Sequence, residues 1–236
     1  MTAGLASRSS AALLVGFFAL CAQASTIAWF GARYSPRDGE RPRRPRTDFI
    51  VLHTTEGALQ GSYGKLFARG EAHFLVDRSG RVYLIIRREK VAYHAGCSMW
   101  NGRRDLDNCS IGIEAVGHYN ESLTDAQYAA LRRLLDNLKG TYGIRDDHVL
   151  THSMVAYGEA NRWYSTPHRG RKRCGMLFAD RTVRARLGLR SQPAYDPDVA
   201  ARRLTVGDAY LARMLYPSAS VQLGGGTPSP SVRGRR

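Results

Sequence analysis

Acidic residues are scarce in this sequence of 236 residues. Asp and Glu number 20 against 35 Lys and Arg, which gives a formal net charge of +15 and a pI near 10.2. Such an excess predicts attraction to a polyanion, such as nucleic acid, anionic lipid or an acidic polymer of the cell wall. An arginine-rich surface that only keeps the protein soluble would explain the same charge, so both interpretations stay open.

Long apolar runs are also missing, except near the start of the chain. There Arg8 precedes the apolar segment 11–20, which is followed by Ala22-Gln23-Ala24. The segment is short for a bilayer span, and this order of residues is typical of a secretory signal peptide. We therefore expect residues 1–24 to direct export to the periplasm or beyond, which argues against a nucleic-acid partner. A lipid anchor on Cys21 is the alternative, but lipoprotein processing sites normally carry a small residue before the cysteine.

Cysteine is rare as well, and its count is informative. Beyond the first 24 residues the chain holds only Cys97, Cys109 and Cys174, an odd number for an oxidising compartment. One thiol therefore needs a reason to stay reduced. We expect Cys97 and Cys109 to form a disulfide and Cys174 to bind a metal ion.

Two histidines provide further ligands for such an ion. His53 ends the strand-like run 48–53 and His152 ends the run 148–152, whereas Cys174 lies in a glycine- and arginine-rich loop. Strand ends bring distant residues to one rim of a sheet, where loops build sites. Two imidazoles and one thiolate occupy three corners of a tetrahedron around Zn2+ and leave the fourth to water, as in catalytic zinc sites. The sequence therefore predicts a zinc site at the rim of a sheet.

Two more residues fit hydrolysis at this site. Glu114 ends the apolar segment 110–114, where a carboxylate is costly without a partner and an activated water would supply one. Lys172 precedes Cys174 by two positions, so both side chains could face one pocket, where an ammonium would stabilise an oxyanion. We predict that Glu114 and Lys172 are catalytic. A salt bridge of Glu114 to an arginine and a solvated position for Lys172 are the alternatives.

Strand-like and helical patterns alternate through the middle of the chain. The apolar runs around the turn at 77–80 predict a hairpin, and the spacing of leucines after Thr124 predicts an amphipathic helix with a capping box. This alternation predicts a mixed α/β fold, with a central mixed β-sheet flanked by α-helices in a single catalytic domain. The expected organisation is a signal peptide at 1–24, an extended basic lead-in at 25–46, the catalytic domain at 47–190, a C-terminal extension packed on it at 191–217 and a disordered tail at 218–236.

Several short motifs follow one another in a fixed order between about residues 46 and 180. They are Val51-Leu52-His53-Thr54-Thr55, Glu71-Ala72-His73-Phe74-Leu75-Val76-Asp77-Arg78-Ser79-Gly80, Ala92-Tyr93-His94-Ala95-Gly96, Trp100-Asn101-Gly102-Arg103 and Asn108-Cys109-Ser110-Ile111-Gly112-Ile113-Glu114. Each motif is weak alone, but the ordered set is specific. In these motifs the chain resembles the zinc-dependent N-acetylmuramoyl-L-alanine amidases of the amidase-2 group, relatives of peptidoglycan-recognition proteins and of phage T7 lysozyme.

The resemblance implies hydrolysis of the amide between the lactyl group of N-acetylmuramic acid and L-alanine, with Zn2+ as cofactor. It implies the same three metal ligands, a general base at Glu114 and a role for Lys172. Candidates for contact with the substrate are His73, His94, Trp100 and Arg103, with Trp163 as a further candidate for sugar stacking. We expect a monomer that takes peptidoglycan or muropeptides as substrate, binds no nucleic acid and contacts an anionic envelope surface through its basic tail.

The chain also departs from the family pattern. Many bacterial relatives have an aspartate where this chain has Cys174, which makes the site sensitive to oxidation, and phage and animal members have a tyrosine in place of Ala72. The loop between His152 and Cys174 is longer than in compact relatives, and its His168 could compete as a ligand. A non-catalytic peptidoglycan-recognition module is the alternative function, although such members usually lack the third ligand. A wall protein that binds polyanions would explain the charge alone.

Overall fold

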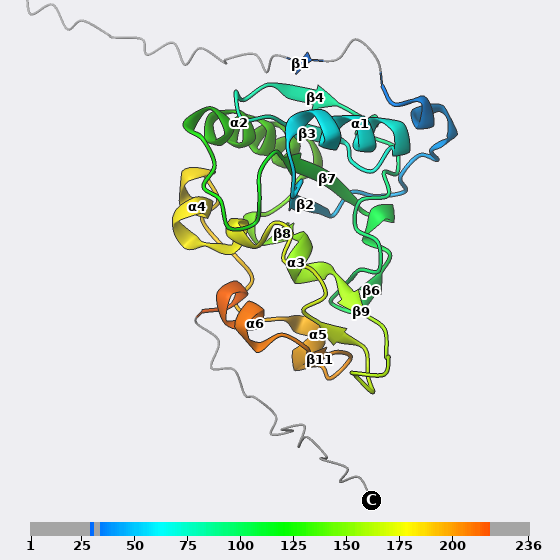
Figure 1. The fold of residues 1–236 in the computed structure, drawn as a ribbon, viewed down its shortest axis with the longest axis vertical. Coiled ribbons are helices and arrows are strands. Elements are labelled where there is room, and N and C mark those ends of the chain that lie inside the picture. Colours follow the sequence, from blue (N-terminus) through cyan, green and yellow to red (C-terminus); the bar gives the residue numbers. More distant parts are fainter. Residues whose placement is uncertain (1–28, 31–33, 218–236) are drawn as a thin grey trace, which may run out of the picture.

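The computed structural model describes residues 29–30 and 34–217. Within them, six strands form a central sheet (Figure 1). The strand order is β1-β4-β3-β7-β2-β8, in which β3 and β4 are antiparallel and the other neighbours are parallel. The strands are β1 (Trp29–Phe30), β2 (Phe49–Thr54), β3 (Phe74–Val76), β4 (Val82–Leu84), β7 (Ser110–Ala115) and β8 (Val149–Thr151). The sheet is mixed, as predicted.

Helices and short strands surround this sheet. The helices are α1 (Leu59–Arg69), α2 (Asp125–Tyr142), α3 (His152–Val155), α4 (Arg181–Arg186), α5 (Pro197–Ala200) and α6 (Ala209–Leu215). The short strands are β5 (Met99–Trp100), which pairs with β6 (Arg103–Arg104), and β10 (His168–Arg169), which pairs with β9 (Tyr157–Gly158) and β11 (Thr205–Val206). The predicted mixed α/β class is confirmed. Within the described residues, no helix is both long and apolar enough to cross a membrane.

Local sequence explains the longest helix. The hydroxyl of Thr124 accepts a hydrogen bond from the Gln127 backbone N–H, and the Gln127 side chain accepts one from the Thr124 backbone N–H. This capping box starts α2, and Gly143 ends it in the left-handed conformation at φ 67°. The apolar face of α2 then packs on one face of the sheet through Leu131, Leu134, Leu135 and Leu138.

The two central strands carry polar residues on the opposite face. Side chains alternate along a strand, so Ile50 and Leu52 of β2 belong to the cluster under α2, whereas Val51 belongs to a second cluster on the other face. His53 is two residues after Val51, so its side chain points to the same face of the sheet as that of Val51. The strand register pairs His53 with Glu114 of β7. Both polar side chains therefore point to the face that loops and the C-terminal elements cover.

Residues 191–217 contact the rest of the molecule through buried charges. In Figure 1 the elements α5, α6 and β11 lie together at the end of the molecule away from α1 and α2. Arg169 of β10 donates to Asp196 at 2.6 Å and to Asp198 at 2.9 Å, and the Asp198 side chain is fully buried. Arg169 also donates to the backbone carbonyl of Val155 in α3. The extension is thus joined to the segment that follows β8.

Two expectations from the sequence need correction. Part of the expected extended lead-in is structured, because residues 36–40 form a 3-10 helix and Arg44 is buried, where it donates to the Lys90 carbonyl. Cys97 and Cys109 are both free, since Cys97 is exposed in a loop while Cys109 is buried in the cluster around Val51. The expected signal peptide and the expected C-terminal tail lie outside the described residues.

Candidate active site

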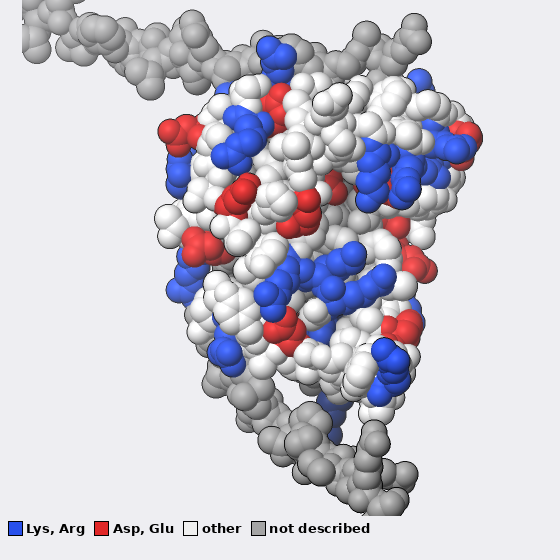
Figure 2. Space-filling model, in the orientation of Figure 1, with Lys and Arg blue, Asp and Glu red and all other residues white. Residues whose placement is uncertain are grey.

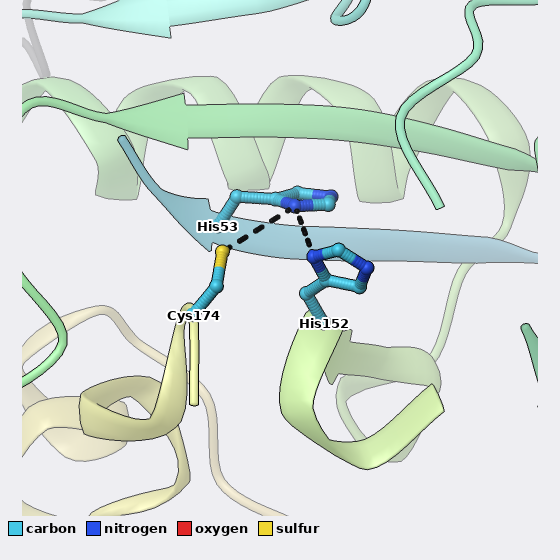
Figure 3. A group of neighbouring side chains, drawn as sticks. All are labelled: His53, His152 and Cys174. Atoms are coloured by element: carbon cyan, nitrogen blue, oxygen red, sulfur yellow. Dashed lines mark hydrogen bonds between the residues drawn. The ribbon is translucent and has the colours of Figure 1, made fainter. Parts of the chain in front are cut away.

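His53, His152 and Cys174 point toward one another from three separate elements (Figure 3). His53 lies near the end of β2, His152 is the first residue of α3 directly after β8, and Cys174 lies in the loop before a 3-10 helix at Met176–Ala179. The Nδ1 atoms of the two histidines are 3.1 Å apart, and Cys174 Sγ lies 3.7 Å from His53 Nδ1. The three side chains expected as metal ligands are therefore brought together.

A glycine allows the Cys174 loop to approach β2 this closely. Gly175 has φ +73°, and a Cβ atom there would lie 2.3 Å from the Leu52 carbonyl oxygen. Its backbone N–H donates to the Thr54 hydroxyl at 2.8 Å. Any side chain at position 175 would push the loop away from the strand, so the Cys-Gly pair is needed to bring the thiol to His53.

These donor atoms fit a tetrahedral zinc ion. Zinc lies about 2.0 Å from histidine nitrogen and about 2.3 Å from cysteine sulfur, so the ligand atoms of a tetrahedral site are about 3.3 Å (N to N) and about 3.5 Å (N to S) apart. The distances of 3.1 Å and 3.7 Å are close to these values. The cluster holds three such residues, and all its ligand atoms lie within 4.8 Å of one another.

Burial keeps both imidazoles in the form that binds metal. It lowers the pKa of His53 well below the ordinary value and that of His152 to about 3, so both rings are neutral at physiological pH. Burial and the nearby Glu114 carboxylate raise the pKa of the Cys174 thiol, which donates to the Thr54 carbonyl at 3.2 Å. A metal ion must therefore displace the thiol proton, as is usual for cysteine ligands.

Glu114 lies beside the cluster with one oxygen unused. Its Oε1 is 3.8 Å from His53 Nδ1, and its buried Oε2 has no hydrogen-bond partner among the described residues. Burial raises the pKa of this carboxyl to about 8. No arginine within the described residues forms the salt bridge with Glu114 that was considered as an alternative. A buried carboxyl with a free oxygen and a pKa near neutrality is suited to accept a proton from a bound water.

Lys172 is exposed on the loop that carries Cys174. Beside burial, the positive charges of Lys172 and Arg171 contribute to the lowered pKa of His152, so they lie close enough to act on the site. Figure 2 shows positive side chains gathered in a band across the middle of one face of the molecule, below a group of acidic side chains. The basic residues on this face are thus locally concentrated rather than evenly spread.

The two histidines expected as candidates for substrate contact are both buried. The His73 side chain is completely buried and accepts a hydrogen bond from the Gly112 backbone N–H at 2.9 Å. The His94 ring is also completely buried and contacts His53, with 3.1 Å between His94 Nδ1 and His53 Nε2. Neither ring is exposed to a substrate in this structure.

Trp100 and Arg103 lie at the other end of β2 from His53. Trp100 is only 7% exposed and packs in the cluster around Val51, so it offers little surface for sugar stacking. Arg103 is paired with Asp48, and both line a separate pocket of about 390 Å3. Trp163, in contrast, is 75% exposed.

His168 does not compete for the metal site. Its ring stacks on Tyr164, with 3.8 Å between the ring centroids, and its Nδ1 lies 3.4 Å from the Thr166 carbonyl oxygen. His168 therefore packs against residues of its own segment, between His152 and Cys174.

Sequence reasoning missed the groups that support the histidines. The Ala95 carbonyl lies 3.2 Å from His152 Nε2, and the Asp107 carboxylate accepts hydrogen bonds from the backbone N–H groups of His94 and Ala95. One signal was available in Gly112, because glycine inside a strand marks the close approach of another group. A Cβ atom at Gly112 would lie 2.3 Å from His94 Cγ.

Comparisons with known proteins match this chain to amidases. A family model described as N-acetylmuramoyl-L-alanine amidase matches residues 42–174. The 1,6-anhydro-N-acetylmuramyl-L-alanine amidase AmpD of Haemophilus influenzae is 35% identical over 144 residues, which cover 52% of this chain and 78% of that protein. The N-acetylmuramoyl-L-alanine amidase AmiD of Escherichia coli K12 is 27% identical over 129 residues, or 48% of this chain and 47% of that protein.

A solved structure supports the fold. The crystal structure of AmpDh3 from Pseudomonas aeruginosa has a TM-score of 0.50 and 24% sequence identity, and the match covers 75% of this chain and 70% of that one. The family model spans more than half of this chain and includes His53, Glu114, His152 and Cys174. The chain therefore belongs to the N-acetylmuramoyl-L-alanine amidase family.

Proposed function

We propose that this protein is a zinc-dependent amidase that cleaves the bond between N-acetylmuramic acid and L-alanine. The observation that carries the proposal is the convergence of His53, His152 and Cys174 beside the unpaired carboxyl of Glu114. The AmpD relative is by its name a 1,6-anhydro-N-acetylmuramyl-L-alanine amidase. That name favours soluble muropeptides, and anhydro forms in particular, as the substrate of this chain.

The chain's own residues have separate tasks in this reaction. His53, His152 and Cys174 would hold the zinc ion, which supplies a Lewis acid for the lactyl carbonyl and acidifies water. Glu114 takes the proton of the attacking water and then gives it to the nitrogen of the leaving L-alanine. Lys172 brings a positive charge near the carbonyl oxygen as that oxygen becomes negative. Water adds to the carbonyl carbon, the C–N bond breaks, and the products are a lactyl carboxylate and a free amine.

Export and envelope contact belong to the same proposal. Residues 1–24 have the pattern of a signal peptide, and the sequence ends in Arg233-Gly234-Arg235-Arg236. A periplasmic or secreted location and a contact of the basic tail with an anionic envelope surface would place the enzyme near its substrate. Cell fractionation of a tagged full-length chain tests the location, and a cytoplasmic, unprocessed protein would contradict it.

Mass spectrometry of muropeptides incubated with the protein tests the activity. We expect release of stem peptides with a free amino-terminal L-alanine, and we expect a chelator, Cys174→Ala and Glu114→Gln each to abolish it. Cys97→Ala and Glu159→Gln are matched controls, because both residues are exposed and lie outside the ligand cluster. Muropeptides that bind but stay intact with zinc present would contradict the proposal and favour a peptidoglycan-recognition module.

A further inference from the structure

One short segment, His94–Ala95, contacts both histidines of the metal cluster. His94 Nδ1 lies 3.1 Å from His53 Nε2, and the Ala95 carbonyl oxygen lies 3.2 Å from His152 Nε2. In each histidine the atom contacted is the ring nitrogen that faces away from the cluster. The segment therefore reaches both rings from outside the cluster.

The hydrogen-bond partners determine which nitrogen of His152 carries the proton. A backbone carbonyl can only accept, so His152 Nε2 must donate to Ala95. A neutral imidazole has a single N–H, and a histidine that binds a metal ion must be neutral. The Nδ1 atom of His152 therefore presents a bare lone pair to the cluster.

Ser110 and His94 determine in the same way which nitrogen of His53 carries the proton. The Ser110 hydroxyl donates its one proton to the Leu106 carbonyl at 2.6 Å, so it must accept from His94 Nε2 at 3.2 Å. His94 Nδ1 is then an acceptor, and His53 Nε2 must donate to it. The Nδ1 atom of His53 is consequently also bare.

Two bare nitrogens thus face each other across 3.1 Å. Neither can donate to the other, and their lone pairs repel unless a cation lies between them. The hydrogen bonds outside the cluster have therefore selected, in both rings, the tautomer that a metal ion requires.

The segment that imposes this choice is itself fixed in place. Asp107 Oδ1 accepts from the backbone N–H of His94 at 2.9 Å and from that of Ala95 at 2.7 Å. The His94 ring lies against Gly112, where a Cβ atom would be only 2.3 Å from His94 Cγ. The ring is completely buried, so it has no room to turn over and exchange its donor and acceptor nitrogens.

We propose that His94 and Asp107 are positioning residues, which through the His94 ring and the Ala95 carbonyl set the tautomer and orientation of both histidine ligands. This inference rests on the zinc site of the proposed function. It assigns His94 a place behind the metal rather than in the substrate groove. The family match alone assigns no such role.

The first test reads the tautomers without metal. In chelator-treated protein, long-range 1H–15N correlation spectra of the histidine rings should show His53 and His152 protonated at Nε2. Ser110→Ala removes the acceptor for His94 Nε2–H and should allow a second tautomer of His53 to appear, while His152 stays unchanged. An Nδ1–H tautomer of either ligand in the wild-type protein would overturn the inference.

The second test measures zinc affinity by competition with a chromophoric chelator. Loss of an outer hydrogen-bond partner typically lowers affinity by about 10- to 100-fold, and we expect this for His94→Phe. His94→Gln should recover most of the loss, because its amide can accept from His53 and donate to Ser110. If His94→Phe does not fold, Ser110→Ala takes its place, with an expected loss of several-fold. Wild-type affinity in the folded variant would overturn the inference.

Asp107→Ala has a matched control. Asp77 accepts from the backbone N–H groups of Ser79 and Arg81 in the same way, but in the turn between β3 and β4. Asp107→Ala removes the acceptor and should weaken zinc binding and change the visible absorption of the Co2+-loaded protein, whereas Asp77→Ala should do neither. Equal effects of the two variants would mean that Asp107 acts only on folding.

Failure of this inference differs from failure of the proposed function. A wild-type protein that binds no zinc, or one that binds it equally well after Cys174→Ala, would contradict the zinc amidase itself. Zinc binding that depends on Cys174 but is indifferent to His94 and Asp107 would leave the amidase intact and overturn only the positioning role.

Discussion

Glu114→Gln should make the enzyme inactive and, at the same time, make the metal-free protein more stable. The substitution keeps the shape of the side chain and removes its charge and its ability to take a proton. Loss of a general base lowers kcat by typically 10²- to 10⁴-fold. The stability effect has a separate cause, which is that burial disfavours the ionised carboxylate, whose Oε2 has no hydrogen-bond partner among the described residues.

The size and sign of the stability effect follow from the pKa of this carboxyl. Burial raises it from an ordinary value of 4.5 to about 8 in the folded protein. Between these values the unfolded chain is ionised and the folded one is protonated, so stability is full below pH 4.5 and is lost as the pH rises to about 8. At 1.36 kcal/mol for each pH unit, the loss approaches about 5 kcal/mol.

Urea denaturation in the presence of a chelator measures this effect. At pH 5 the wild-type protein and Glu114→Gln should have nearly the same free energy of unfolding, and at pH 8 the variant should be more stable by several kcal/mol. Glu159→Gln, at a half-exposed position, is the control and should show no such difference. A stability gap between wild type and Glu114→Gln that is the same at both pH values would refute the reasoning.

Three further predictions follow from the described contacts. Cys174→Asp should retain zinc with an oxygen ligand and resist hydrogen peroxide, which should inactivate the wild type, and equal sensitivity would contradict a thiolate ligand. Lys172→Ala should lower kcat by roughly 10²-fold with less effect for Lys172→Arg, and an unchanged kcat would mean a solvated charge. Asp198→Ala removes one of the two carboxylates that pair with the buried guanidinium of Arg169 and should cost about 1.5–3 kcal/mol in urea denaturation. Arg203→Ala, at the exposed side of the same network, should cost less than about 1 kcal/mol, and equal losses would contradict this account.

The parts of the molecule that could be predicted depend on local pattern. The capping box of α2 and its leucine spacing are local, and both are present in the structure. His53 and His152 could be grouped because each follows an apolar strand, and strand ends of one sheet meet at one edge. The position of Cys174 needed more than pattern, since a loop thiol reaches β2 only through the close approach that Gly175 permits.

The parts that could not be predicted depend on how loops fold over the sheet. The motifs around His94 and Trp100 indicated a substrate groove, but the segment between them folds into the face of β2 and β7, which buries both side chains. Arg44 belongs to the segment expected as an extended basic lead-in, yet it is buried, and the backbone carbonyls of Lys90 and Arg88 accept from it. Charge and residue type do not indicate burial when the compensating partners are backbone carbonyls, because those partners leave no mark in the sequence.

The metal dependence proposed for this enzyme would explain together several features of the site that are otherwise unfavourable. Two imidazole nitrogens without protons face each other at 3.1 Å, and the carboxyl of Glu114 is buried with an unused oxygen. The Cys174 thiol lies beside them with a raised pKa. Each feature costs free energy in the metal-free protein, and a dication at the centre of the cluster would relieve all three. On the proposed zinc site, the surrounding hydrogen bonds from Asp107 through His94 and Ala95 would prepare the cluster for the metal at the expense of the metal-free state.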